Sequence, residues 1–152
     1  MIKKYFNNNV FLINFKKYKD NRGYFYESYQ KKNYKFFGIK NNFIQDNHSF
    51  SQSKFTIRGL HVQKNPFGQA KLITVIKGSI YDVIVDLRKK STTFGKYKFF
   101  ELSEKNNLQL YIPEGFAHGF CTLEKNTLVH YKVSKYYSKK HEVTLKWNDE
   151  QL

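Results

Sequence analysis

Short runs of alternating apolar and polar residues, separated by polar turns, dominate this 152-residue chain. Alternation with a period of two is typical of strands, whereas apolar residues three or four positions apart, which would indicate helices, are scarce. Strands that recur every 8 to 12 residues or so favour a β-sandwich or barrel. The sequence predicts an all-β fold of about nine or ten strands and little helix, only about one turn at 29–37. The predicted strands are Val10 to Phe15, Gly23 to Tyr29, Phe43 to Ser51, Lys54 to Gln63, Lys71 to Ile76, Ser79 to Leu87, Lys96 to Leu102, Leu108 to Ile112, Gly119 to Leu123 and Thr127 to Val133.

The clearest pair of strands flanks Gly78, with Lys71 to Ile76 before it and Ser79 to Leu87 after it. Glycine supplies the positive φ that a tight turn between two strands needs. The two segments are therefore expected to form a β-hairpin.

A candidate base and a candidate cation, His61 and Lys71, are expected on neighbouring strands near this turn. Gly59 lies between Arg58 and His61, and a glycine within a strand often marks a bulge that redirects the next side chain. Such a bulge would allow Arg58 and His61 to share one cavity. A base beside a cation can remove a proton next to a carbonyl and stabilise the negative oxygen that results.

Length and composition limit the classes of protein to which this chain can belong. A chain of 152 residues is expected to form a single domain, 1–152. Its one cysteine, Cys121, excludes an intrachain disulfide, suits a reducing compartment and is expected to be buried in a strand. No apolar run is long enough to span a membrane and no signal-peptide core follows Met1, so we predict a cytoplasmic protein without a membrane partner.

The net charge of +15 is spread over scattered lysine pairs. A basic chain often binds nucleic acid, because lysines neutralise phosphates. Here no recognition helix or RNA-binding aromatic signature accompanies the lysines. We therefore expect a solvated basic surface and no nucleic-acid partner, while a small anionic ligand remains compatible with the charge.

The segment Pro113-Glu114-Gly115-Phe116-Ala117-His118 resembles the second motif of the cupin β-barrels. Metal-binding cupins carry two histidines one residue apart in their first motif, because an open metal site needs at least three protein ligands. This chain has His61-Val62-Gln63 at that place. We therefore predict a cupin cavity without a metal.

Several further motifs follow one another in a fixed order, and together they resemble the dTDP-4-dehydrorhamnose 3,5-epimerase family over nearly the whole chain from Asp20. They are Arg22-Gly23-x-Phe25-x-Glu27, Gln45-Asp46-Asn47-His48-Ser49, Arg58-Gly59-Leu60-His61-x-Gln63, Gln69-x-Lys71-Leu72, Asp82-Val83-x-Val85-Asp86-Leu87-Arg88, Phe94-Gly95, Phe116-Ala117-His118-Gly119-Phe120 and Trp147-Asn148-Asp149.

The resemblance implies a cupin jelly roll that forms a homodimer, uses no cofactor and acts on dTDP-4-dehydro-6-deoxy-glucose. It implies His61 as the base, Lys71 as the cation near an enolate oxygen and Tyr131 as the acid that returns a proton from the far side. The other matching positions would bind the nucleotide, its diphosphate or the sugar. They are Arg22, Phe25, Glu27, Gln45, Asn47, Arg58, His118, Tyr137 and Glu142.

The same resemblance implies a carboxylate paired with the catalytic histidine. In relatives this carboxylate, together with a ligand-binding lysine, follows the Trp147-Asn148-Asp149 segment at positions beyond Leu152. Within this chain Asp82 and Asp86 are the candidates to replace it. Such a partner would fix the tautomer of the imidazole and support the imidazolium.

Four other functions share parts of this pattern. An epimerase that inverts only C3 or only C5 and a sugar 3,4-ketoisomerase would use the same fold and ligand class. A metal-dependent cupin oxygenase would need a bound metal. A non-catalytic module would bind the nucleotide sugar without exchanging its hydrogens with solvent.

Overall fold

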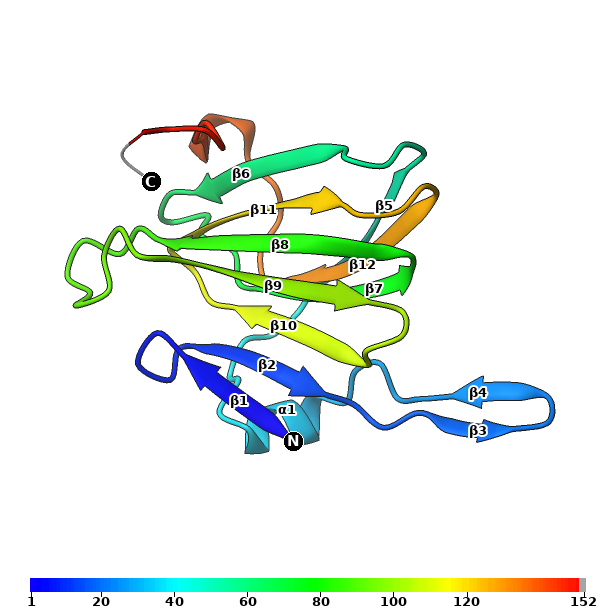
Figure 1. Cartoon of the computed structure of the whole chain (residues 1–152). Coiled ribbons are helices and arrows are strands. Elements are labelled where there is room, and N and C mark those ends of the chain that lie inside the picture. The colour runs from blue at the N-terminus through cyan, green and yellow to red at the C-terminus, as the bar shows by residue number, and fades with distance from the viewer. Residues whose placement is uncertain (151–152) are drawn as a thin grey trace.

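The computed structural model describes residues 1–150, which form two antiparallel sheets that face each other and a separate two-stranded arm (Figure 1). The six-stranded sheet has the order β1-β2-β10-β7-β12-β5, and the five-stranded sheet has the order β13-β6-β11-β8-β9. The arm consists of β3 and β4, and the fold class predicted from the alternation is confirmed. The strands are β1 (Ile2–Tyr5), β2 (Val10–Asn14), β3 (Tyr18–Asp20), β4 (Gly23–Phe25), β5 (Gln45–Ser51), β6 (Ile57–Gln63), β7 (Lys71–Lys77), β8 (Ser79–Asp86), β9 (Tyr97–Ser103), β10 (Leu108–Ile112), β11 (Phe116–Thr122), β12 (Thr127–Val133) and β13 (Glu142–Thr144); the helices are α1 (Lys31–Phe36) and the 3₁₀ turn Lys139–His141.

The core between the sheets is filled by side chains from the inner face of each. Ile73 and Leu110 of the six-stranded sheet are fully buried with Ile80 and Ile84 of the five-stranded sheet. These residues occupy alternate positions along their strands, because successive side chains of a strand point to opposite faces. Outside the six-stranded sheet, Tyr34 of α1 packs on a second apolar cluster.

The predicted hairpin around Gly78 is wrong. β7 pairs with β10 and β12, whereas β8 pairs with β9 and β11, so the chain passes at Gly78 from one sheet to the other. Gly78 does adopt the expected positive φ, +80°. A tight turn with glycine serves a sheet-to-sheet corner as well as a hairpin, and the local sequence does not distinguish them. His61 and Lys71 therefore lie on facing sheets and not on neighbouring strands.

The predicted bulge at Gly59 is confirmed. In the β6–β11 ladder His118 lies opposite His61 and Phe120 opposite Arg58, so two residues of β6 face the single residue Gly119. The extra residue brings Arg58 and His61 to the same face. Gly59 has a φ of +107°, and a Cβ there would lie 2.6 Å from the Gly119 Cα. Glycine is therefore required on both torsional and steric grounds.

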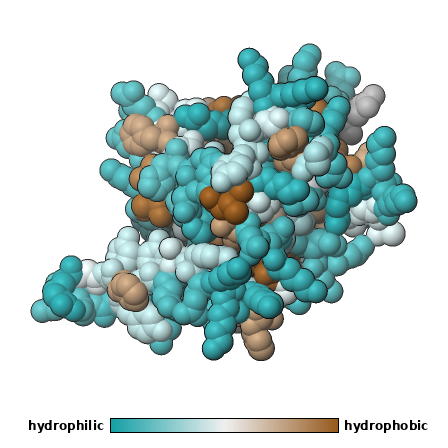
Figure 2. Space-filling model, turned by 180° about the vertical axis from the view of Figure 1, so that it is seen from behind, coloured by the Kyte–Doolittle hydropathy of each residue, from teal (hydrophilic) through white to brown (hydrophobic). Residues whose placement is uncertain are grey.

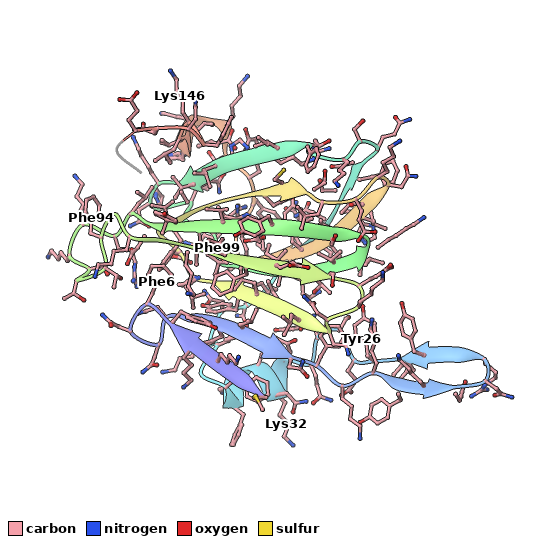
Figure 3. The ribbon with its side chains drawn as sticks, in the orientation of Figure 1. Phe6, Tyr26, Lys32, Phe94, Phe99 and Lys146 are labelled. Carbon is pink, nitrogen blue, oxygen red and sulfur yellow. The ribbon has the colours of Figure 1, made fainter. Side chains whose placement is uncertain are left out.

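Other boundaries differ from the predictions. β1, β3 and β13 were not predicted, and the expected strand Gly23 to Tyr29 ends at Phe25, in the arm that projects away from both sheets (Figure 1). Tyr26, labelled in Figure 3, lies where the arm joins the body. Cys121 is only partly buried, because it lies on the outer face of the five-stranded sheet beside Trp147.

One face of the molecule is largely polar. Seen from behind in Figure 2, hydrophilic side chains cover most of the face, and hydrophobic ones appear as separate spots. Phe99, labelled in Figure 3, is one apolar side chain that remains half exposed on β9. No helix within residues 1–150 is long and apolar enough to cross a membrane.

Candidate active site

A cavity of about 410 Å³ opens between the two sheets. It is bounded by β5, β7 and β12 on one side and by β6, β11 and β13 on the other. Most of the predicted site residues line it, although they are spread over almost 100 positions of the chain. These are Gln45, Asn47, Arg58, His61, Lys71, His118, Tyr131, Tyr137 and Glu142.

His61 projects into the cavity from β6, and β13 lies beside it. Its Nδ1 is 3.4 Å from Glu142 Oε1 and 3.3 Å from Thr144 Oγ1. The nearby negative charge of Glu142 favours a proton on Nδ1, and the Nε2 lone pair is then left free. Burial lowers the pKa of His61, and the charge of Lys71 lowers it further, while Glu142 opposes both. The imidazole is therefore neutral near pH 7 and able to accept a proton.

Neither aspartate predicted to partner His61 does so. Asp82 is 2.8 Å from His118 Nε2, and Asp86 is held by Arg88 at 2.7 Å. The carboxylate beside His61 is that of Glu142, which the family resemblance predicts as a ligand-binding residue. Pairing of β13 with β6 brings Glu142 there from 81 positions along the chain, a proximity that no local motif encodes.

Lys71 enters the cavity from β7, on the sheet that faces His61. Burial lowers the pKa of Lys71 to about 8, and the carboxylates of Asp82 and Glu142 oppose this shift. The side chain is thus a cation at neutral pH, but it loses its proton at a lower pH than an exposed lysine does. A cation held inside the cavity is well suited to stabilise a developing oxyanion.

Tyr131 lies on the inner face of β12, the strand next to β7. Burial raises the pKa of Tyr131, and the charge of Arg58 only partly offsets the effect. The phenol therefore keeps its proton at neutral pH and can donate it. A proton acceptor and a proton donor thus face the cavity from opposite sheets.

Polar groups surround this centre. Arg58 donates hydrogen bonds to Ser51 Oγ at 3.1 Å and to the carbonyl oxygen of Phe50 at 2.9 Å, which fix its guanidinium at the cavity wall. Tyr137 donates to Glu142 Oε2 at 2.9 Å. Guanidinium and imidazole groups in this setting are suited to phosphate and sugar oxygens.

Comparison with known proteins shows the family of this chain. The family model described as dTDP-4-dehydrorhamnose 3,5-epimerase matches residues 7–152. The chain belongs to the dTDP-4-dehydrorhamnose 3,5-epimerase family. The fold and family predicted from the motifs are thereby confirmed.

Among curated relatives, the dTDP-4-dehydrorhamnose 3,5-epimerase of Sinorhizobium fredii is 45% identical over 92% of this chain and 72% of its own length. The Shigella flexneri epimerase is 44% identical over 94% of this chain and 79% of its own. A crystal structure of the Bacillus anthracis epimerase with TDP and PPi bound aligns with a TM-score of 0.97 at 49% identity, covering all of this chain and 87% of that one. The Legionella pneumophila enzyme in complex with dTDP-4-keto-L-rhamnose aligns at 0.94 and 41% identity, covering 99% of this chain and 80% of that one.

The epimerase-family cavity also contains residues that were not among the predicted site residues, although Ser49, Gln69 and Phe120 stand within the motifs that carry the family resemblance. Ser49 follows Gln45 and Asn47 on the inner face of β5, and Val129 and Val133 flank Tyr131 on β12. Strand alternation alone would have found them, since residues two apart share a face. Gln69, Ile73 and Phe120 complete the lining.

Three predicted ligand-binding residues do not reach the cavity of this epimerase-family chain. Arg22 and Phe25 belong to the arm, and Glu27 follows it. Arg22 pairs with Asp20 at 2.7 Å, Phe25 is 67% exposed, and Glu27 accepts a hydrogen bond from Gln30. Among the residues described, no group of three or more His, Cys, Asp or Glu side chains could hold a metal ion.

Proposed function

We propose that this protein epimerises dTDP-4-dehydro-6-deoxy-D-glucose at C3 and C5 to give dTDP-4-dehydro-L-rhamnose. The observation that carries the proposal is the arrangement of His61 and Tyr131 on facing sheets, with Lys71 inside the same cavity. Curated relatives that carry this activity in their names and the ligand of the Legionella structure support the choice of substrate.

The chemistry follows from the C4 ketone, which acidifies the hydrogens on C3 and C5. His61 removes one of these protons through Nε2; the C–H electron pair forms a double bond to C4, and the carbonyl pair moves to O4. The ammonium of Lys71 stabilises the enolate oxygen. Tyr131 then donates its proton to the same carbon from the opposite face, which inverts the centre. Solvent returns a proton to Tyr131 and takes one from His61, and the cycle repeats at the second carbon.

The remaining lining residues bind the rest of the substrate. Arg58 and His118 are placed to bind the diphosphate or the sugar, and Gln45 and Asn47 offer polar contacts from β5. Tyr137 is half exposed at the cavity, where it can stack on thymine, a contact worth roughly 1–3 kcal/mol. No cofactor enters this scheme, and we expect the enzyme to act in the cytoplasm.

We further infer a homodimer in which the arm of one chain completes the site of the other. Within residues 1–150, β3 and β4 pair only with each other and extend away from the sheets (Figure 1). Arg22, Phe25 and Glu27 are therefore available to a second copy and remote from their own cavity. In a two-fold dimer each arm would reach the cavity of the partner in the same way.

Incubation with dTDP-4-dehydro-6-deoxy-glucose in heavy water, followed by NMR and mass analysis of the sugar, tests the activity. We expect deuterium at both C3 and C5 and a product with the L-rhamno configuration. His61→Ala should abolish exchange at both carbons, because it removes the base; appreciable exchange in that variant would remove His61 from this role.

The other outcomes of this experiment identify the rival functions. Deuterium and inversion at one carbon only indicate a single-centre epimerase. A ketone that moves from C4 to C3 indicates a 3,4-ketoisomerase, and binding without any exchange indicates a non-catalytic module. Activity that depends on added metal after chelation would identify a metal-dependent enzyme.

A further inference from the structure

Asp82, on β8, is a buried carboxylate that the mechanism above does not use. Its side chain is fully buried, and Oδ2 is 2.8 Å from His118 Nε2. Its second oxygen, Oδ1, is the one buried side-chain nitrogen or oxygen in the described part of the chain without a hydrogen-bond partner. Leaving such an oxygen unpaired in the interior costs free energy, so its presence calls for a functional explanation.

The strand register places Asp82 on the inner face of the five-stranded sheet, beside the cavity lining. It lies opposite Phe120, which lines the cavity, and its neighbours Ile80 and Ile84 on the inner face of β8 belong to the core between the sheets. Lys71 points into the same interior from the facing sheet. The Asp82 charge acts on Lys71 and raises the pKa of Lys71 against the effect of burial.

Lys71 has other charged neighbours, but none of them matches Asp82 as a counter-ion for its ammonium group. Glu142 is the second carboxylate acting on Lys71, but it lies at the more exposed edge of the cavity, where Tyr137 and His61 already contact it. The guanidinium of Arg58 adds a further positive charge to the cavity, and Tyr131 and His118 complete the titratable groups of its lining. A buried charge is screened less by solvent and salt than an exposed one, so Asp82 is the stronger counter-ion.

We propose that Asp82 is a positioning residue of this site: it orients the His118 ring and serves as the buried counter-ion that keeps Lys71 a cation. The hydrogen bond from His118 Nε2 to Oδ2 leaves Nδ1 as the ring nitrogen available to a ligand. The inference rests on the proposed function only where it concerns the enolate, because the charge of Lys71 can be measured without substrate.

The test is a titration of Lys71 in the ligand-free, full-length protein labelled with [13C]lysine. The ε-carbon signal of Lys71 is assigned by its absence in Lys71→Met. We expect Asp82→Asn, which keeps the side-chain shape, to lower the Lys71 pKa by roughly 1 unit. Asp46→Asn is the matched control, because Asp46 lies on the outer face of the six-stranded sheet, where it pairs with Lys132; it should leave the Lys71 titration unchanged.

An Asp82→Asn protein in which Lys71 titrates as in the wild type overturns the proposal. Asp82→Ser is measured in parallel as a second uncharged variant, so that a folding defect of one leaves the other to decide. In turnover, loss of the counter-ion should move the alkaline limb of the kcat/KM profile to lower pH, whereas a merely structural defect would lower the rate equally at every pH. If the wild-type protein has no epimerase activity, the proposed function is refuted. The counter-ion role of Asp82 still holds in that case if the Lys71 pKa is shifted in the Asp82 variants.

Discussion

His61 and His118 show how strongly the surroundings of one residue type decide what it can do. The two rings are opposite each other in the β6–β11 ladder. His61 is partly exposed, has a carboxylate at the longer distance of 3.4 Å and keeps one nitrogen free for the cavity. His118 is held at 2.8 Å by a fully buried aspartate. The first arrangement suits a base that must gain and lose a proton, and the second suits a ring that must stay in place.

The prediction for Tyr131 concerns its phenolic hydroxyl group. Tyr131→Phe removes the proton donor but keeps the ring, so we expect inversion to slow by roughly 10²–10⁴-fold with little change in substrate binding. Exchange at C3 and C5 should fall less, because His61 remains. Steady-state kinetics and deuterium incorporation measure the two rates. Tyr97→Phe, on the exposed face of β9, is the control; equal inversion rates for the two variants would assign Tyr131 to packing.

The prediction for Glu142 concerns the pH dependence of kcat/KM. Glu142 raises the pKa of His61 by stabilising the imidazolium. Glu142→Gln removes that effect, so the His61 pKa falls further and the acid limb of the kcat/KM profile moves to lower pH. The maximal rate should also drop, because the imidazolium that forms when His61 takes a proton loses the support of the carboxylate. Glu101→Gln, on the exposed face of β9, should change neither quantity. An acid limb that stays in place would separate Glu142 from the base.

At the scale of the element, the bulge in β6 brings His61 and Arg58 into one cavity. Gly59→Ala places a methyl group 2.6 Å from the Gly119 Cα and 2.7 Å from the His118 carbonyl oxygen. We expect the free energy of unfolding to fall by about 1–3 kcal/mol from this crowding, in addition to the cost of a positive φ. Gly95→Ala shares the positive φ but meets no atom within 4 Å, so it reports the torsional cost alone. Urea unfolding of both variants measures the difference, and equal losses would mean that β6 moves freely to accommodate the methyl group.

Most of the strands that build the two sheets could be predicted from the sequence, but their partners could not. Alternation places Tyr131 and Asn47 on inner faces, and Gly59 signals its own bulge, because these features depend on neighbouring residues. The corner at Gly78 was mistaken for a hairpin because both need the same backbone conformation. The proximity of Glu142 to His61 depends on the register of β13 with β6, which the sequence near either residue does not determine.

At the scale of the whole molecule, the arm decides whether a cavity is complete. Suppose that the Arg22 of each chain lies in the cavity of the partner. A mixed dimer of a His61→Ala chain and an Arg22→Ala chain then has one cavity with both His61 and Arg22 and one cavity with neither. Such dimers, isolated by two different affinity tags after co-expression, should show about half the wild-type activity, as expected for two symmetric sites. A dimer of two His61→Ala chains, tagged in the same way, is the control. Activity no higher than that of the Arg22→Ala protein alone would place the arm of each chain at its own site.

In the proposed mechanism, the two-layer construction of the cavity also determines the configuration of the product. A sugar ring lying between the sheets then has one wall that takes protons and another that gives them, so each carbon receives a new proton on the face opposite the one that lost its proton. The distance between the two sheets is set by core packing, for example of Ile73 against Ile84. This distance thereby controls on which face the carbon is protonated. A variant with a loosened core would admit water to both faces of the enolate, and labelled but uninverted starting material would accumulate.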